Sequence, residues 1–174
     1  AWLSLDEYDD DPLLFLRYLV AAIQTAYPHF GETILAALQG AQVPAWLQLI
    51  NMFVNDLAHL AQPLFLVLDD YHVITNTEIH KLLNRLLDYM PPAMHLVVLS
   101  RIEPPLALAR LRVNREMQEL HTADLAFSAQ EIAEFLMQTV DRDLPPDLLQ
   151  ALYTNCEGWI AGLQLMVLSL PHHA

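Results

Sequence analysis

The chain has 174 residues, of which 55% are hydrophobic, and its formal net charge is −13 at pH 7. This length suits one domain, or one domain with a small lid, and the apolar content is enough to fill a core. The negative charge argues against binding to nucleic acid or to an anionic membrane surface, because both demand a basic face.

Other features of the sequence favour a cytoplasmic protein. Cys156 is the only cysteine, so no internal disulfide can form, as is usual in a reducing compartment. Residues 1–5 lack the basic start of a signal peptide and read as a strand, so the chain is expected to begin within a domain. The apolar stretches 13–23 and 159–170 contain Arg17 or are too short to span a bilayer.

Strand and helix patterns alternate in the first two thirds of the chain, which predicts an α/β fold with a parallel sheet and helices on both of its faces. A short strand is predicted at residues 2–5. Asp11 is a predicted N-cap, Pro12 lies in the first turn of the helix that follows, and Pro44 opens another helix. Residues 64–68 are apolar throughout, which predicts a strand covered on both faces.

Later elements complete this α/β region. Thr75 and Glu78 have the spacing of a capping box, so a helix is expected to start there and to stop at the Pro91-Pro92 pair. A buried strand is predicted at 95–100, a helical turn at 106–111 and a further strand at 117–121.

From Ser128 onward the sequence predicts helices only. Ser128 and Glu131 form a second capping box, Pro145-Pro146 starts a second helix, and Trp159 begins the apolar stripe of a third. We therefore expect two parts, a partial α/β core at 1–124 and a small all-helical subdomain at 125–174.

Asp69 and Asp70 directly follow the apolar run, which is how a nucleoside triphosphatase presents its Mg²⁺-binding acid at the end of a buried strand. The matching phosphate-binding loop needs closely spaced glycines that end in a lysine. Neither is present, because the only lysine, Lys81, has none of the four glycines beside it. The pattern indicates a nucleotide switch without the half that grips phosphate.

Several short signatures then occur in one order along the chain. They are Trp2 to Glu7, the Asp11-Pro12 helix start, Leu66 to His72, Ser100-Arg101, Leu111-Arg112, Leu125 to Ser128, and Glu157 to Leu165. Together they resemble the ATPase module of MalT-like, LuxR-type large transcriptional regulators, a branch of the STAND signalling ATPases. The resemblance runs to about Leu170 and implies a partial P-loop NTPase sheet of the AAA+/STAND type with flanking helices.

This resemblance also implies roles for single residues. Asp69 matches the Walker B acid that holds Mg²⁺, and Asp70 matches the catalytic acid that orients the attacking water. Arg101 matches the sensor arginine that reads the γ-phosphate. Gly158 and Trp159 match the place where a lid helix docks near the nucleotide. ATP and Mg²⁺ are thus the cofactors expected of the intact parent, and neither is expected to bind this fragment, which should be inactive.

In intact members of that family a glycine-rich loop precedes this region, and a C-terminal helix-turn-helix binds DNA, so this chain by itself is not expected to bind DNA. The main alternative is a non-catalytic interaction scaffold that keeps the fold. An Asp pair can also be the polar end of a strand, Arg101 a surface residue, and Gly158 a site of close helix packing. A phosphoacceptor receiver is rejected, because Lys81 lies within a predicted helix.

The missing phosphate-loop strand leads to one more expectation. In the family it lies between the strands that match 95–100 and 117–121. Without it, residues 96–99 would be an apolar edge open to pairing with another chain. We therefore expect either that the strand at 117–121 closes the gap or that the chain self-associates.

Overall fold

A computed structural model describes residues 1–139 and 146–169 of the chain. Three strands, nine α-helices and two short 3₁₀ helices occur in these residues. In chain order they are β1 (Trp2–Ser4), η1 (Glu7–Asp10), α1 (Pro12–Gln24), α2 (Glu32–Gln39), α3 (Trp46–Ala58), β2 (Leu64–Asp69), η2 (Tyr71–Val73), α4 (Thr77–Tyr89), β3 (Met94–Val98), α5 (Leu108–Asn114), α6 (Thr122–Leu125), α7 (Ala129–Thr139), α8 (Pro146–Cys156) and α9 (Ile160–Ser169).

The chain divides into two compact units, residues 1–111 and 112–174. The predicted division at residue 125 between a core and a lid remains a prediction. Unit 1 holds the sheet, with the large core beneath it. The described part of unit 2 is helical, and its small core consists of Ile132, Leu136, Leu152, Cys156 and Leu163.

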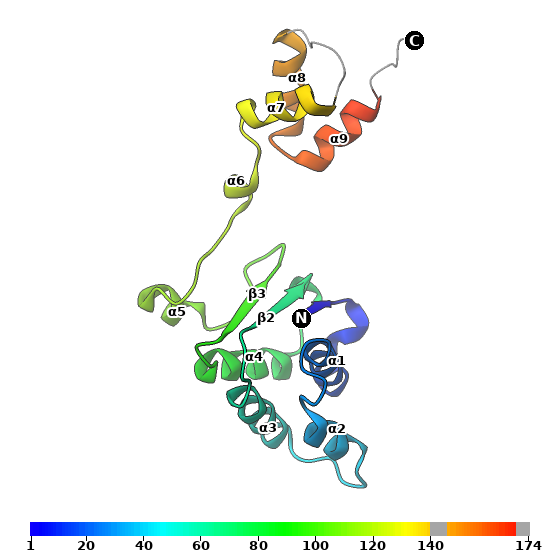
Figure 1. The fold of residues 1–174 in the computed structure, drawn as a ribbon, viewed down its shortest axis with the longest axis vertical. Helices are drawn as coiled ribbons and strands as arrows, with labels where there is room; N and C mark the ends of the chain where they lie inside the picture. The colour runs from blue at the N-terminus through cyan, green and yellow to red at the C-terminus, as the bar shows by residue number, and fades with distance from the viewer. Residues whose placement is uncertain (140–145, 170–174) are drawn as a thin grey trace. The chain divides into compact units, whose positions relative to one another are not determined.

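The sheet is parallel and has the order β1-β2-β3, which confirms the α/β class expected from the sequence (Figure 1). Trp2 lies opposite Val67, and Val67 lies opposite Val97. Residues paired in this way share a face of the sheet, because side chains alternate between faces along each strand.

Helices α1 to α4 cover only one face of the sheet (Figure 1). On that inner face Leu64, Leu66 and Leu68 are buried, and they join the core formed with α1, α3 and α4. On the outer face Phe65 remains 58% exposed and Trp2 also 58%. The expectation of helices on both faces, and of a β2 strand covered on both, was therefore wrong for the part of the chain that the structure describes.

The predicted strand at 117–121 was also wrong. These residues form neither strand nor helix, and they lie between α5 and α6. Strand β3 pairs only with β2 among the described residues, so the first of our two expected outcomes, a gap closed by 117–121, does not occur.

The first residues of the helices test the predicted N-caps. The Asp11 carboxylate accepts hydrogen bonds from the backbone N–H groups of Leu13 and Leu14, which confirms it as the N-cap of α1. The Ser128–Glu131 capping box before α7 is confirmed as well. The box at Thr75 was wrong, because Asn76 caps α4 instead.

Two other features of the helices differ from the expectation. Helix α3 begins two residues after the expected Pro44, and helix α2 was not predicted at all. Pro145, at the predicted start of a helix, lies outside the described residues, and so does the end of the apolar stretch 159–170.

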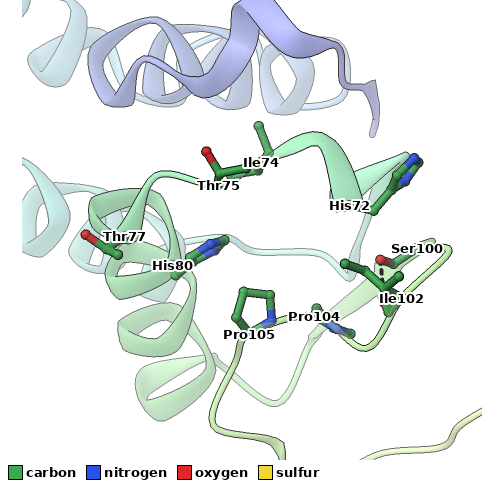
Figure 2. A pocket seen from close by; sticks show the side chains of 9 residues that line it. All are labelled: His72, Ile74, Thr75, Thr77, His80, Ser100, Ile102, Pro104 and Pro105. Atoms are coloured by element: carbon green, nitrogen blue, oxygen red, sulfur yellow. Dashed lines mark hydrogen bonds between the residues drawn. The ribbon is translucent and has the colours of Figure 1, made fainter.

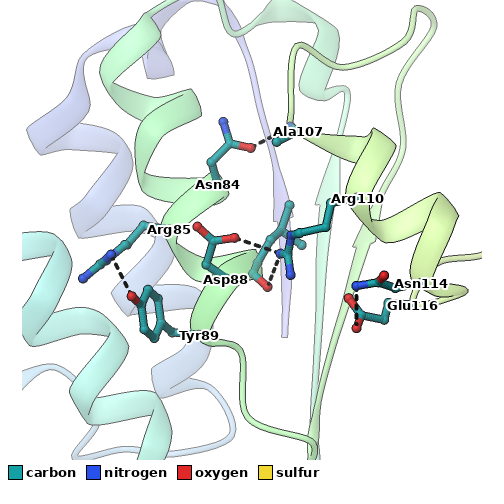
Figure 3. Close-up of polar contacts among 9 residues, drawn as sticks. Asn84, Arg85, Asp88, Tyr89, Ala107, Arg110, Asn114 and Glu116 are labelled. Carbon is teal, nitrogen blue, oxygen red and sulfur yellow. Dashed lines mark hydrogen bonds and ion pairs between the residues drawn. The ribbon is translucent and has the colours of Figure 1, made fainter.

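The start of α5 is attached to α4 by polar contacts within unit 1. The Asn84 side-chain oxygen accepts a hydrogen bond from the backbone N–H of Ala107 at 2.8 Å. Arg110 forms an ion pair of 2.8 Å with Asp88 (Figure 3). The segment that leaves β3 is thereby held along α4, and this fixes the loop that carries Arg101.

Candidate functional site at the carboxyl edge of the sheet

The acidic pair stands at the carboxyl end of β2, as the sequence predicted. Along β2 the side chains alternate, so Asp69 continues the outer row of Phe65 and Val67. Its partner across the sheet is Ser4 of β1. Asp70 follows with a left-handed backbone, φ 55°, which reverses the chain into η2. Aspartate tolerates this conformation better than most residues.

Backbone hydrogen bonds hold this turn from both neighbouring strands. The Asp69 carbonyl accepts from the Leu5 N–H at 3.1 Å, and the Tyr71 N–H donates to the Leu99 carbonyl at 2.9 Å. The Asp70 N–H also donates to the Asp69 carboxylate at 3.0 Å. The position of both acids is thus fixed by the main chain, while both side chains remain partly accessible.

Arg101 lies just beyond the carboxyl end of β3, the strand next to β2. Its side chain is exposed and forms no ion pair in the part of the chain that the structure describes. The turn around it is shaped by Ser100, whose hydroxyl donates to the Ile102 carbonyl at 2.7 Å. The fold therefore brings Asp69, Asp70 and Arg101 to the same edge of one sheet.

A cleft of about 340 Å³ lies beside this edge (Figure 2). It opens between the segment from η2 to the start of α4 and the loop after β3. Its lining residues are His72, Ile74, Thr75, Thr77, His80, Ser100, Ile102, Pro104 and Pro105. Ligands of open α/β sheets bind at the carboxyl ends of the strands, so this is where a ligand of unit 1 is expected.

Beneath the cleft, Tyr71 and His80 form a buried pair, with 2.6 Å between the Tyr71 hydroxyl and His80 Nδ1. Burial raises the pKa of Tyr71 well above 10, and the charge of Asp10 adds to the rise. Burial also lowers the pKa of His80 below 6.5, against the opposing attraction of Asp10. Both groups are therefore neutral at pH 7. We assign the hydroxyl as donor and Nδ1 as acceptor, which places the His80 proton on Nε2.

The sequence analysis missed this pair and also the role of Asp10. The Asp10 carboxylate accepts hydrogen bonds from the backbone N–H groups of Thr75 and Asn76 and from the Thr75 hydroxyl. Burial alone would raise the pKa of Asp10, but these hydrogen bonds together lower it. Asp10 and Thr75 are 65 positions apart, and no local pattern reveals a bond of that span.

Gly158 and Trp159 lie in unit 2, and each has a packing role there. Gly158 has φ 79°, and an added Cβ would stand 2.7 Å from the Phe127 carbonyl oxygen. Trp159 is 64% exposed and covers Gly162 in the first turn of α9. These contacts agree with the packing alternative. Their predicted nearness to a nucleotide remains a prediction.

The carboxylates at the carboxyl edge of the sheet suit a Mg²⁺ site that is completed by a nucleotide. Within residues 1–139 and 146–169, no group of three or more His, Cys, Asp or Glu side chains is placed to hold a metal ion. Mg²⁺ in nucleotide sites often uses only one or two carboxylates, with phosphate oxygens and water as its other ligands. Asp69 suits that arrangement, in which the nucleotide completes the coordination.

No family model matches the chain. The chain does match curated relatives, among them proteins that carry the name HTH-type transcriptional regulator MalT. The protein of Cronobacter sakazakii is 38% identical over 169 residues, that of Yersinia enterocolitica 39% over 169, and that of Vibrio parahaemolyticus 34% over 172. These alignments cover 97%, 97% and 99% of this chain and 19% of each relative.

The chain thus spans about a fifth of the length of the curated relatives that it matches. None of the helices in the described residues has the length and apolarity needed to cross a membrane. The order of signatures in the sequence and these alignments agree: the chain is a MalT-like segment, similar to part of proteins that carry the name HTH-type transcriptional regulator.

Proposed function

We propose that this chain forms the half of a nucleotide-dependent switch that positions metal and water, in a MalT-type regulator whose ATPase module is of the STAND type. The observation that carries the proposal is the placement of Asp69 and Asp70 at the carboxyl end of β2, beside the loop that bears Arg101. Two neighbouring parallel strands that deliver two acids and an arginine to one edge suit phosphoryl-transfer chemistry.

Each residue has a separate task in this proposal. Asp69 contributes a carboxylate to the Mg²⁺ site, and the metal, when bound, neutralises charge on the phosphates. Asp70 accepts a hydrogen bond from the attacking water and aligns it. Arg101, exposed and without an ion pair in the described part of the chain, contacts the terminal phosphate and thereby distinguishes ATP from ADP.

In this proposal the groups that bind the phosphates directly lie outside these residues. Lys81 pairs with Glu78 on the surface of α4 and is not near a glycine-rich loop. A longer protein that carries this chain together with a glycine-rich, lysine-ending loop is thus the working switch in the proposal. Binding of DNA and regulation of transcription in response to a signal belong to that longer protein.

The test uses such a longer protein and three variants. Asp69→Ala should weaken Mg²⁺-dependent ATP binding. Asp70→Asn should leave binding intact and slow turnover, because alignment of water matters mainly in the transition state. Arg101→Ala should reduce the preference for ATP over ADP. Equal affinity, turnover and nucleotide preference in wild type and all three variants would contradict the proposal.

A second candidate function is a non-catalytic interaction scaffold. It is favoured by the exposed apolar side chains on the outer face of the sheet and by the edge of β3, which is unpaired among the described residues. The scaffold predicts no nucleotide dependence in any variant, but loss of assembly when outer-face residues become polar. The three substitutions above therefore separate the two candidates.

A further inference from the structure

His72 has a ring nitrogen whose environment is unusual. It lies in η2, two residues after Asp70, and its side chain is 20% exposed. Its Nδ1 atom is buried and has no hydrogen-bond partner among residues 1–139 and 146–169. Buried polar atoms are almost always hydrogen-bonded in folded proteins, so an exception calls for a specific explanation.

The acidic group beside that nitrogen is Asp70. His72 Nδ1 and Asp70 Oδ1 are 3.7 Å apart, which is too long for a hydrogen bond but close enough for a small side-chain rotation to form one. The Asp70 side chain is half exposed and therefore free to rotate. Its backbone is not free, because Val73 N–H donates to its carbonyl and Tyr71 N–H is bound to Leu99.

Other groups near the cleft are already engaged. The second histidine, His80, uses its Nδ1 to accept from Tyr71. The Asp10 carboxylate is occupied by Thr75 and Asn76. Asp70 is therefore the carboxylate that remains within reach of His72 Nδ1.

We propose that His72 is a positioning residue, whose Nδ1–H donates a hydrogen bond to Asp70 and holds that carboxylate in the orientation needed to align water. This role rests on the proposed function of Asp70. The proposal fixes the ring as the Nδ1–H tautomer, since only a protonated Nδ1 can donate to a carboxylate. His80 should have the opposite tautomer, with its proton on Nε2.

The first experiment uses this chain alone and needs no nucleotide. Nitrogen-15 NMR of the histidine rings distinguishes the two tautomers at neutral pH. We expect His72 to be mainly the Nδ1–H form, and Asp70→Gly, which suits the positive φ, to remove that preference. His80 is the internal control and should stay in the Nε2–H form. A His72 ring in the Nε2–H form, or one unchanged by Asp70→Gly, would overturn the proposal.

The second experiment measures ATP turnover in the longer protein that carries this chain. An Asn side chain places its amide N–H groups near the position of Nδ1, whereas Gln places them near Nε2. His72→Phe should lower kcat about tenfold to a hundredfold, as loss of an orienting partner usually does, with KM for ATP within about twofold. His72→Asn should recover most of that loss and His72→Gln little of it.

Equal activity of the Asn and Gln variants, or a change confined to KM, would contradict the positioning role. A wild-type protein that does not hydrolyse ATP would overturn the proposed function and the role of His72 in turnover with it. The tautomer experiment would still decide whether His72 and Asp70 are paired, so the two failures can be told apart.

Discussion

The two faces of the sheet differ sharply although the strands supply apolar side chains to both. On the inner face Leu66 and Leu68 are 0% exposed beneath the helices. On the outer face Phe65 stacks on His95, with 4.6 Å between ring centroids, and both remain exposed. The same strand therefore supports a complete core on one side and an open apolar surface on the other.

This difference shows what an apolar run can and cannot indicate. An exposed run of large side chains is unusual for a surface that faces water, and it marks a place where other protein packs. Asp69 continues the outer row, so the acid that we assign to Mg²⁺ lies at the end of the open face. We interpret the outer face as the side on which the rest of the switch assembles.

The largest expected effect comes from truncating a buried side chain of the inner face, compared with the same truncation of an exposed side chain on the outer face. Leu66→Ala should lower the free energy of unfolding by about 2–5 kcal/mol, because it leaves a cavity in the core. Phe65→Ala should cost less than about 1 kcal/mol, since its ring is already largely in water. Urea denaturation followed by circular dichroism measures both.

Two outcomes would contradict the expected difference between the inner and the outer face. If Phe65→Ala were as destabilising as Leu66→Ala, the outer face would be covered in solution. If neither mattered, the inner core would not be the main source of stability in unit 1.

A second, smaller effect concerns the stability of the fold at acidic pH. The pKa of His80 is lowered by burial, so the unfolded chain takes up a proton at higher pH than the folded chain does. Stability is then complete above about pH 6.5, the ordinary value for histidine, and declines as the pH falls below it. Asp10, whose pKa is also lowered, adds a further loss below its ordinary value of 3.8.

Urea midpoints at pH 7.5 and pH 5.5 test the contribution of the buried histidine. His80→Asn should reduce the difference between the two midpoints, whereas the matched change His95→Asn, on the exposed face, should not. A pH dependence that is the same in both variants would show that His80 is not its source.

A third prediction concerns the open face and the edge of β3. We expect the chain to self-associate through them, because unpaired strand edges and exposed apolar patches favour contact with another chain. Light scattering across a dilution series should show a mass above that of one chain at high concentration. Replacing Phe65 with Ser should lower the association, and replacing the exposed Tyr89 on α4 should not. A strictly monomeric chain at all concentrations would contradict this.

The sequence predicted the elements with strong local signals. Caps at Asp11 and Ser128 and the end of α4 before the Pro91-Pro92 pair were confirmed, because each depends on residues within one or two turns. The acid pair at the end of β2 was placed correctly for the same reason. Coverage of the outer face and the strand at 117–121 were predicted wrongly, since both depend on neighbours that periodicity does not describe.

The candidate site was predictable in part. Asp69, Asp70 and Arg101 follow from strand ends in a parallel sheet, whose carboxyl ends meet at one edge. The Tyr71–His80 pair and the bond from Asp10 to Thr75 could not be predicted, because they join residues on different elements. The roles assigned to the three edge residues remain predictions.

The smallest expected effect is in nucleotide binding by this chain alone, where we expect no binding. This chain alone should give no measurable heat when titrated with Mg-ATP, because the backbone amides and the lysine that grip phosphate are not in its sequence. Asp69 and Asp70 alone contact phosphate only through a metal. A dissociation constant in the micromolar range would contradict this and would place a phosphate site within unit 1.

The most direct test of the central claim is the effect of Asp70→Asn on single-turnover ATP hydrolysis by the longer protein. Asparagine tolerates the same left-handed backbone, so the substitution changes the charge with little effect on the fold. We predict that the affinity for Mg-ATP stays within about twofold while the rate falls by about a hundredfold or more, as expected when a catalytic acid–base group is lost. An unchanged rate would contradict the assignment of Asp70 as the residue that aligns water.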